Sequence, residues 1–499
     1  MALPLIDISH GVVRLPQWRL AAPLDFALCE GEHIAIVGNN GAGKTLLADI
    51  LTSRHPLFPR KLAPGAFTPG ALDNPRYGFS GAVADNLKYI SFRDAYGGDN
   101  DRAYYLQQRW NSFDIGEDTP TARAKLEAAY LLAGSDTPER RTWQEHVYRL
   151  LDMEAFLDKC IVLLSSGELR KFRLAEALFS EPRVLMMDNP FIGLDAPTRA
   201  VVADLLTRLS REGTMQIVLI LSRPEEIPAF ITHVVEVKDG VVAPKIPFKD
   251  FKGSPVREHV LCEEAKQAIL NLPDEEAPSA EVVRMEGVSI AYGEHVLLRN
   301  LSWRVNAGEK WLLTGRNGSG KSTLLSLVCA DNPQSYACNI SLFGRRRGSG
   351  ESIWDIKKHI GYVSPEMHRA YRENVPALRI VASGTSDFSG LYKRISEEET
   401  EKCRFWMRIF GIGSLADKPF LSLSDGEQRL LLVARAFVKD PGLLILDEPL
   451  HGLDPTRRRL VLDIIEAFCS RPSKTLIMVT HYEDEVPRCI GHRIVLQRP

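Results

Sequence analysis

The pattern GxxxxGK followed by Ser or Thr occurs twice in this chain, as GNNGAGKT at 38–45 and as GRNGSGKS at 315–322. Each copy follows a short apolar run that predicts a strand and precedes a pattern that predicts a helix. Strand, glycine-rich loop and helix in this order are typical of parallel α/β domains. The copies begin at 38 and 315, an offset of 277 in a chain of 499 residues, so the repeat predicts two homologous domains.

Two further motifs repeat in the same order. LSSGE at 164–168 returns as LSDGE at 423–427, and VLMMDNP at 184–190 returns as LLILDEP at 443–449, each at an offset of 259. We expect the first domain over 1–245, a linker over 246–281 and the second domain over 282–499. Prolines and acidic residues indicate the linker, which holds one short helix that either packs on the surface or docks a partner.

Composition limits the partners and the location. The 62 Lys and Arg nearly balance the 64 Asp and Glu, and this gives no general attraction to nucleic acid, so we expect no nucleic-acid partner. Apolar runs such as MQIVLIL are far shorter than the roughly 18 residues that span a bilayer, and the N-terminus does not resemble a signal peptide. The eight cysteines show no metal-ligand spacing and are expected to be reduced. We therefore predict a cytoplasmic protein, peripheral on the inner face of the membrane if it serves a transporter.

The glycine-rich loops predict ATP binding, because glycines let backbone amides and a helix N-terminus face phosphate groups. Lys44 and Lys321 would reach the β- and γ-phosphates. The hydroxyl groups of Thr45 and Ser322 would bind Mg²⁺. The predicted phosphate-binding residues are Gly38, Asn39, Asn40, Gly41, Ala42, Gly43, Lys44, Thr45, Gly315, Arg316, Asn317, Gly318, Ser319, Gly320, Lys321 and Ser322.

Taken together, the glycine loop, the LSxGE signature, the strand that ends in aspartate and the following GLD resemble the ATP-binding cassette (ABC) ATPases, in family order over nearly the whole chain. The resemblance implies an α/β fold with two tandem ABC-type P-loop ATPase domains, each with a mainly parallel core sheet and a helical subdomain. It also implies hydrolysis of ATP to ADP and phosphate in a head-to-tail pair of domains. The signature residues Ser165, Gly167, Ser424 and Gly426 would then face the γ-phosphate bound by the opposite domain. The resemblance also implies that Asp188 and Asp447 bind Mg²⁺ together with Thr45 and Ser322.

The two predicted sites differ at one decisive position. After the aspartate, the second copy has Glu448 where the first has Asn189, and an amide cannot act as a general base. By resemblance, the catalytic residues are Glu448, His481 and Lys321, and Tyr292 stacks on adenine. When the two copies are aligned, Arg223 stands at the position of His481 and Leu15 at the position of Tyr292, with Trp18 close to Leu15 in sequence. Either the first site binds ATP without turnover, or the change to Asn189 has no functional effect because another residue serves as the base.

Both copies depart from the family at a position where a glutamine is usual, since the chain has Phe92 and Pro365 there. The stretch LFGRRRGSGESIWDIKKHIGYVS, 342–364, is similar to the ModF-type family of twin-cassette ATPases, which is linked to molybdate transport and to photorepair. That resemblance implies an energy-coupling subunit for a separate membrane permease. Proteins that act on ribosomes or in DNA repair, and sugar-importer ATPases, remain alternatives. The run Arg345–Arg347 is a solvated turn, a contact with a protein partner or a contact with nucleic acid.

Overall fold

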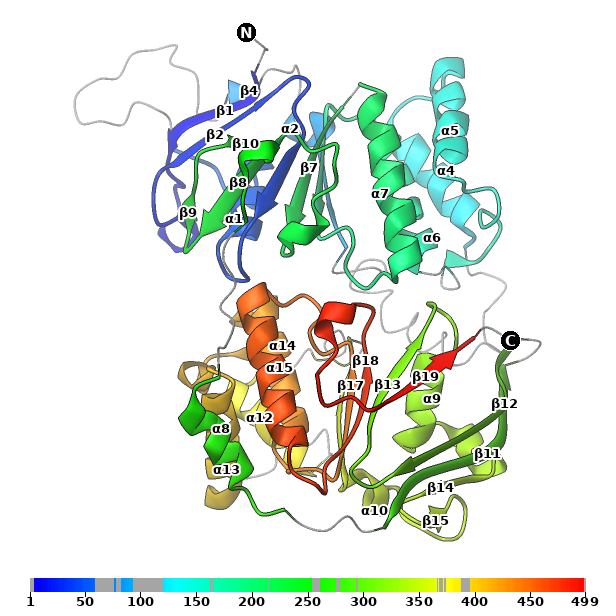
Figure 1. Ribbon diagram of the computed structural model, residues 1–499. Helices are drawn as coiled ribbons and strands as arrows, with labels where there is room; N and C mark the ends of the chain where they lie inside the picture. The colour runs from blue at the N-terminus through cyan, green and yellow to red at the C-terminus, as the bar shows by residue number, and fades with distance from the viewer. Residues whose placement is uncertain are drawn as a thin grey trace. The chain divides into compact units, whose positions relative to one another are not determined.

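The computed structural model describes residues 4–58, 76–77, 82–92, 120–161, 164, 166–213, 215–253, 261–274, 279–292, 295–365, 367, 371, 374–386 and 395–497. The chain divides into two compact units, Met1–Pro255 and Val256–Pro499, which we call the first unit and the second unit. Each is drawn in Figure 1 and is described here by itself.

A mainly parallel sheet forms the centre of the first unit, with strands in the order β10-β8-β3-β7-β6-β5. The five strands from β8 to β5 are parallel, whereas β10 and β9 pair with β8 in antiparallel fashion. Every side chain of β6 and β7 is buried, as expected for a parallel sheet covered on both faces. The strands are β3 (Ile34–Val37), β5 (Leu87–Ser91), β6 (Val184–Asp188), β7 (Gln216–Leu221), β8 (His233–Lys238), β9 (Val241–Val242) and β10 (Ile246–Pro247).

A small antiparallel sheet and the helices complete the first unit. The antiparallel sheet has the order β2-β1-β4 and contributes to the same apolar core as α1. Helices α4 and α5 contact α6 and form a helical part at one end of the unit (Figure 1). The elements are β1 (Pro4–Gly11), β2 (Leu24–Cys29), β4 (Arg76–Tyr77), α1 (Lys44–Leu51), α2 (Val83–Asn86), α4 (Ala122–Ala133), α5 (Pro138–Leu150), α6 (Ser166–Leu178) and α7 (Ala196–Arg211).

The second unit repeats this plan. Its five-stranded sheet has the order β16-β17-β18-β13-β19 and is parallel throughout, and its antiparallel sheet has the order β12-β11-β14-β15. The predicted α/β class with two tandem P-loop units is thus confirmed. The strands are β11 (Glu281–Tyr292), β12 (His295–Asn306), β13 (Lys310–Gly315), β14 (Ile340–Leu342), β15 (Arg345–Arg346), β16 (Ile360–Val363), β17 (Leu443–Asp447), β18 (Thr475–Val479) and β19 (His492–Leu496).

Helices of the second unit pack in the same arrangement, with α12 and α13 against α14. The short helix expected between the domains is α8, which contacts α15 and buries Ile269 in the core of the second unit. At the other end of the expected linker, β10 belongs to the sheet of the first unit. The helices are α8 (Glu263–Leu270), α9 (Lys321–Val328), α10 (Ile353–Lys357), α12 (Ala377–Ser386), α13 (Glu397–Ile409), α14 (Asp425–Phe437) and α15 (Pro455–Cys469).

Candidate functional site

The glycine-rich loop of the second unit turns tightly between β13 and α9. Gly320 has a φ of 89°, and a Cβ atom there would lie 2.8 Å from the carbonyl oxygen of Leu297, so only glycine fits. The ammonium group of Lys321 donates to the carbonyl oxygens of Gly315, at 2.7 Å, and Arg316, at 3.0 Å. A positive charge therefore lies against the loop at the N-terminus of α9.

The first unit builds the same loop between β3 and α1. Gly43 has a φ of 104°, and Lys44 Nζ donates to the carbonyl oxygens of Gly38, at 2.5 Å, and Asn39, at 2.9 Å. Neither α1 nor α9 has a side-chain hydrogen bond at its N-cap. In each unit the first-turn amides and a lysine thus form an anion-binding cradle of the kind that fits phosphate groups.

Two observations test whether the second loop suits a nucleotide. Ser319 Oγ is buried and has no hydrogen-bond partner in the structure. This hydroxyl group could therefore form a hydrogen bond with a ligand bound in the loop. The Ser322 side chain is exposed in the first turn of α9, as is Thr45 in α1. The residues predicted to bind phosphate, 38–45 and 315–322, run from the end of β3 or β13 into the first turn of α1 or α9.

Asp188 ends β6 and Asp447 ends β17. Each of these strands lies next to an edge strand of its own sheet, and both aspartates are buried. The carboxyl ends of parallel strands share one edge, which is where ligands bind in such sheets, and the glycine loops leave from the same edge. In the first unit the hydroxyl of Tyr89, on β5, donates to Asp188 Oδ2 at 3.0 Å. Sequence reasoning missed Tyr89, although the parallel position in the second unit is also a tyrosine, Tyr362.

The residue after each aspartate adopts the same strained backbone. Asn189 and Glu448 have φ values of 50° and 47°, in the left-handed region that non-glycine residues rarely adopt. Each is held by a main-chain bond to the adjacent strand, from Asn189 N to Ile220 O at 2.8 Å and from Glu448 N to Val479 O at 2.9 Å. The two turns are therefore built alike, and the difference between the units lies in the side chain.

The two side chains make different contacts. Glu448 Oε1 lies 3.2 Å from His481 Nε2, and both side chains are largely buried. Burial alone would raise the pKa of Glu448, but the contact with His481 and the electrostatic interactions with His451, His481 and Arg429 outweigh burial and lower the pKa to about 2. Asn189 Nδ2 instead donates to Asp188 Oδ1 at 2.7 Å. The second unit thus holds a buried carboxylate where the first holds an amide.

Comparison with known proteins agrees with this architecture. The profile of the family described as ABC transporter matches residues 298–451. The chain is 36% identical to the ABC transporter ATP-binding protein ModF of Escherichia coli, over 98% of this chain and 96% of that protein. It is 30% identical to an uncharacterized ABC transporter ATP-binding protein of Schizosaccharomyces pombe, over 94% of this chain and 93% of that one.

The chain belongs to the ABC family of ATP-binding proteins. It is accordingly an ATPase with two tandem ABC units. A solved structure of the archaeal ribosome recycling factor aABCE1, in complex with a ribosomal stalk protein, aligns over 97% of this chain and 87% of that one with a TM-score of 0.52 and 19% identity, which shows a shared fold. Within the described residues, no helix is long and apolar enough to cross a membrane.

The ABC signature residues open α6 and α14. Ser165 lies outside the described residues. Gly167 packs closely on α7, since a Cβ atom there would lie 2.8 Å from Thr198 Cγ2. At α14, the backbone N–H and the hydroxyl of Ser424 both donate to Glu427 Oε2, at 2.9 and 2.6 Å, and Gly426 is buried. The role of the signature serines and glycines as γ-phosphate ligands stays a prediction.

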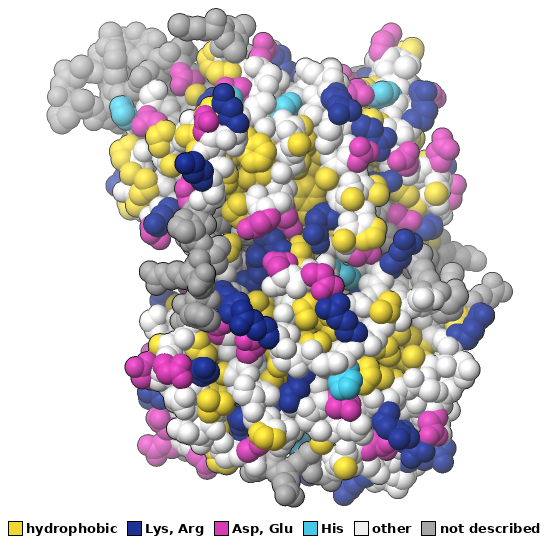
Figure 2. All heavy atoms as spheres, viewed as in Figure 1, with side chains coloured by type: hydrophobic (Ala, Val, Ile, Leu, Met, Phe, Trp, Pro, Cys, Tyr) yellow, Lys and Arg dark blue, Asp and Glu magenta, His cyan; other side chains and the backbone are white. Residues whose placement is uncertain are grey.

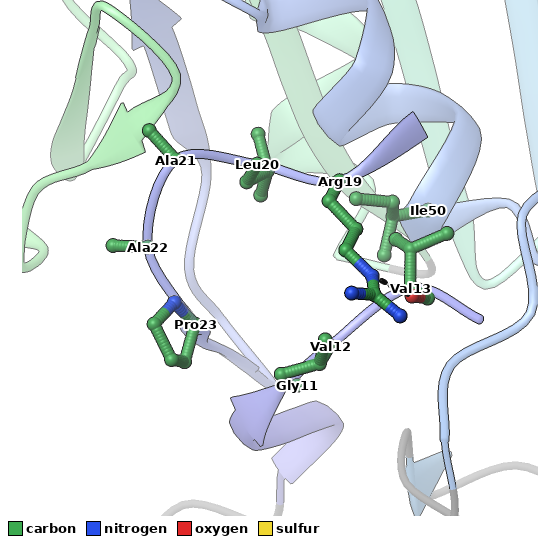
Figure 3. Close-up of a pocket in the computed structure, with 9 residues that line it drawn as sticks. All are labelled: Gly11, Val12, Val13, Arg19, Leu20, Ala21, Ala22, Pro23 and Ile50. Atoms are coloured by element: carbon green, nitrogen blue, oxygen red, sulfur yellow. Dashed lines mark hydrogen bonds between the residues drawn. The ribbon is translucent and has the colours of Figure 1, made fainter. Parts of the chain in front are cut away.

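The adenine-binding predictions fall in the antiparallel parts of the ABC units. The Tyr292 side chain lies outside the described residues. Trp18 is 45% exposed and stacks on His55 with ring centroids 4.9 Å apart, while Leu15 is 46% exposed. Figure 3 shows a nearby cavity of about 190 Å³ in which Arg19 Nε donates to the carbonyl oxygen of Val13 at 3.0 Å. None of its lining residues is a predicted phosphate or metal ligand.

Sequence reasoning also missed one buried arginine in each signature helix, Arg170 and Arg429. Both follow the signature serine by five residues, and both reach the turn after the strand-end aspartate of their own unit. The available signal was an arginine at the same position after the signature in both copies. At the two positions where the resemblance leads us to expect glutamine, Phe92 N donates to the carbonyl oxygen of Asp188 at 3.5 Å, and Pro365 follows Ser364, whose carbonyl oxygen accepts from Arg429.

Proposed function

We propose that the two ABC units divide the work, with hydrolysis at the second unit and stable ATP binding at the first. The observation that supports this division is the contact of Glu448 with His481 in the second unit, set against the contact of Asn189 with Asp188 in the first. A carboxylate can orient and accept a proton from water, whereas a neutral amide cannot.

In the second unit, each polar group has a place in this scheme. Lys321 and the loop amides bind the phosphates, and Ser322 and Asp447 would hold Mg²⁺. A bound Mg²⁺ would neutralise phosphate charge and polarise the γ-phosphoryl group. The lowered pKa keeps Glu448 ionised at neutral pH, so that its carboxylate can accept a hydrogen bond from the attacking water. His481, held beside it, would stabilise charge that develops on the γ-phosphate.

The first unit keeps the binding groups without the base. Lys44 and Thr45 occupy the positions of Lys321 and Ser322, and Asp188 is buried at the strand end. Tyr89 and Asn189 donate to the two oxygens of Asp188 and hold its carboxylate in one orientation. We propose that this unit retains ATP with Mg²⁺ and that the two units pair head to tail, each signature helix serving the opposite loop.

The direct test is ATP hydrolysis by matched variants at the two equivalent positions. Glu448→Gln should lower kcat by about 10² to 10⁴, the usual contribution of a general base. Asn189→Gln, which exchanges one amide for another, should hydrolyse ATP close to the parent rate, and Asn189→Glu should raise the rate. Normal turnover by Glu448→Gln would refute the division of labour.

We further propose that hydrolysis drives a separate membrane permease, with the chain at the inner face of the membrane. The support is the similarity over almost the full length to a protein named as an ABC transporter ATP-binding protein, ModF; a role in molybdate transport is the finer form of this proposal. On the described part of the face in Figure 2, both Lys or Arg and Asp or Glu side chains occur.

Capture of partners tests the transport proposal. Tagged Glu448→Gln protein with Mg-ATP should retain ATP and bring down an integral membrane protein, and the tagged Lys321→Ala variant should not. Recovery of ribosomal particles or DNA-repair proteins without a membrane protein would contradict transport and leave the ATPase assignment intact.

A further inference from the structure

Arg429 joins three segments that surround the proposed hydrolytic site. It lies in α14, is 2% exposed, and donates to main-chain carbonyl oxygens on two other segments. One is the residue after β16, Ser364, at 3.0 Å from Nη1. The other is the turn after β17, where the guanidinium donates to the carbonyl oxygens of Asp447, Glu448 and Pro449.

These bonds bear on Glu448 because its side chain projects from the turn that they hold. The backbone there is in the left-handed region, with φ of 47°, a conformation that persists only where neighbouring groups fix it. The planar guanidinium carries five donors in a fixed geometry and can hold several carbonyl oxygens at once. A lysine ammonium is a point donor and would hold fewer of them in a defined direction.

The first unit shows that the link is a property of the fold and is not specific to one site. Arg170 is also buried, and it donates to the carbonyl oxygens of Pro190, at 2.8 Å, and Ile192. Its guanidinium lies 5.3 Å from the ring centroid of Phe92. In both units, then, an arginine of the signature helix reaches the turn after the aspartate and also the residue that follows the edge strand, Phe92 in the first unit and Ser364 in the second.

We infer that Arg429 is a positioning residue for ATP hydrolysis: it fixes the turn that carries Glu448 and couples the start of α14 to that turn. Its hydrogen bonds to the turn go to main-chain carbonyl oxygens, and its charge also favours the ionised form of Glu448. In the proposed scheme it does not contact the nucleotide. This inference rests on the proposed function, in which Glu448 serves the attacking water.

The test compares Arg429→Lys with Arg435→Lys in the full-length protein. Arg435 lies on the same helix, is half-buried, and donates from Nε to Ser383 Oγ at 2.8 Å, away from the Glu448 turn. Arg429→Lys should lower kcat at least about tenfold, because small displacements of a catalytic group are costly, while KM for ATP changes less than about twofold. Arg435→Lys should lower the melting temperature about as much as Arg429→Lys does, but should leave kcat unchanged.

A double-mutant cycle separates positioning from general destabilisation. Because Arg429 acts through Glu448, Arg429→Lys should lower the residual rate of Glu448→Gln no further. If Arg429→Lys is poorly folded, Arg429→Gln offers an uncharged amide donor and should give the same pattern. A parental kcat in a folded Arg429 variant, or an equal loss in Arg435→Lys, would overturn the inference. Full hydrolysis by Glu448→Gln would instead overturn the proposed function.

Discussion

At the scale of single residues, the charge of Glu448 couples stability to pH. Its pKa is lowered from the usual 4.5 to about 2 in the folded chain, so the folded state favours the carboxylate more than the unfolded state does. The stability that this charge contributes is present above pH 4.5 and is lost as pH falls toward 2. Protonation of Glu448 in acid therefore lowers the free energy of unfolding.

We expect the unfolding free energy of the parent to fall more steeply with acidification than that of Glu448→Gln, which has no proton to bind. Urea unfolding at pH 5.0 and at several lower values would measure both slopes. The curves should converge as pH falls below 4.5; parallel curves would show that the carboxylate is not preferentially stabilised in the fold.

At the scale of secondary-structure elements, Asp440 ties together the turns of the second unit. It lies between α14 and β17 and binds two buried cations that follow α15, Arg471 at 2.6 Å and Lys474 at 2.9 Å. Arg471 also donates to the carbonyl oxygen of Pro273, after α8. The carboxylate thus joins the connection before β17 to the one after α15, and Arg471 extends this link to the residues after α8.

Removal of this carboxylate should be costly. Asp440→Ala leaves Lys474 without its carboxylate and Arg471 with only Asp274, at 3.8 Å, and should lower the unfolding free energy by about 3 kcal/mol. The matched control is Glu181→Ala at the corresponding, exposed turn of the first unit, which should change it by less than about 0.5 kcal/mol. Denaturant titration of both variants decides the matter, and equal effects would contradict the argument.

The elements themselves could be predicted from the sequence, but these polar ties could not. The strands before Asp188 and Asp447 are continuous apolar runs, and such runs predict buried parallel strands. The bond from Tyr89 to Asp188 joins residues 99 positions apart, and no local pattern encodes it. Lys474 lies in a polar, turn-like stretch that is normally exposed, yet it is buried because Asp440 compensates its charge.

At the scale of the whole molecule, the chain has separate apolar cores in its two units. Phe179 belongs to a core of the first unit and Phe468 to a core of the second, and both are buried. Replacement of either by alanine should cost about 3 to 5 kcal/mol through lost contacts and a cavity. In scanning calorimetry, we expect one unfolding transition for each unit. Phe179→Ala should lower the midpoint temperature of the first unit's transition, and Phe468→Ala that of the second unit's transition. An equal shift of all transitions in both variants would show a single cooperative unit.

The turn after each strand-end aspartate has a practical consequence. Main-chain bonds to the neighbouring strand fix the backbone of Asn189 and Glu448, and the same φ accommodates an amide in one unit and an acid in the other. The backbone conformation at this position therefore accepts either side chain, and we expect exchanges between amide and acid to leave the turn intact. We expect that variants with no hydrolytic site, one or two could be made from this scaffold by substitution at positions 189 and 448.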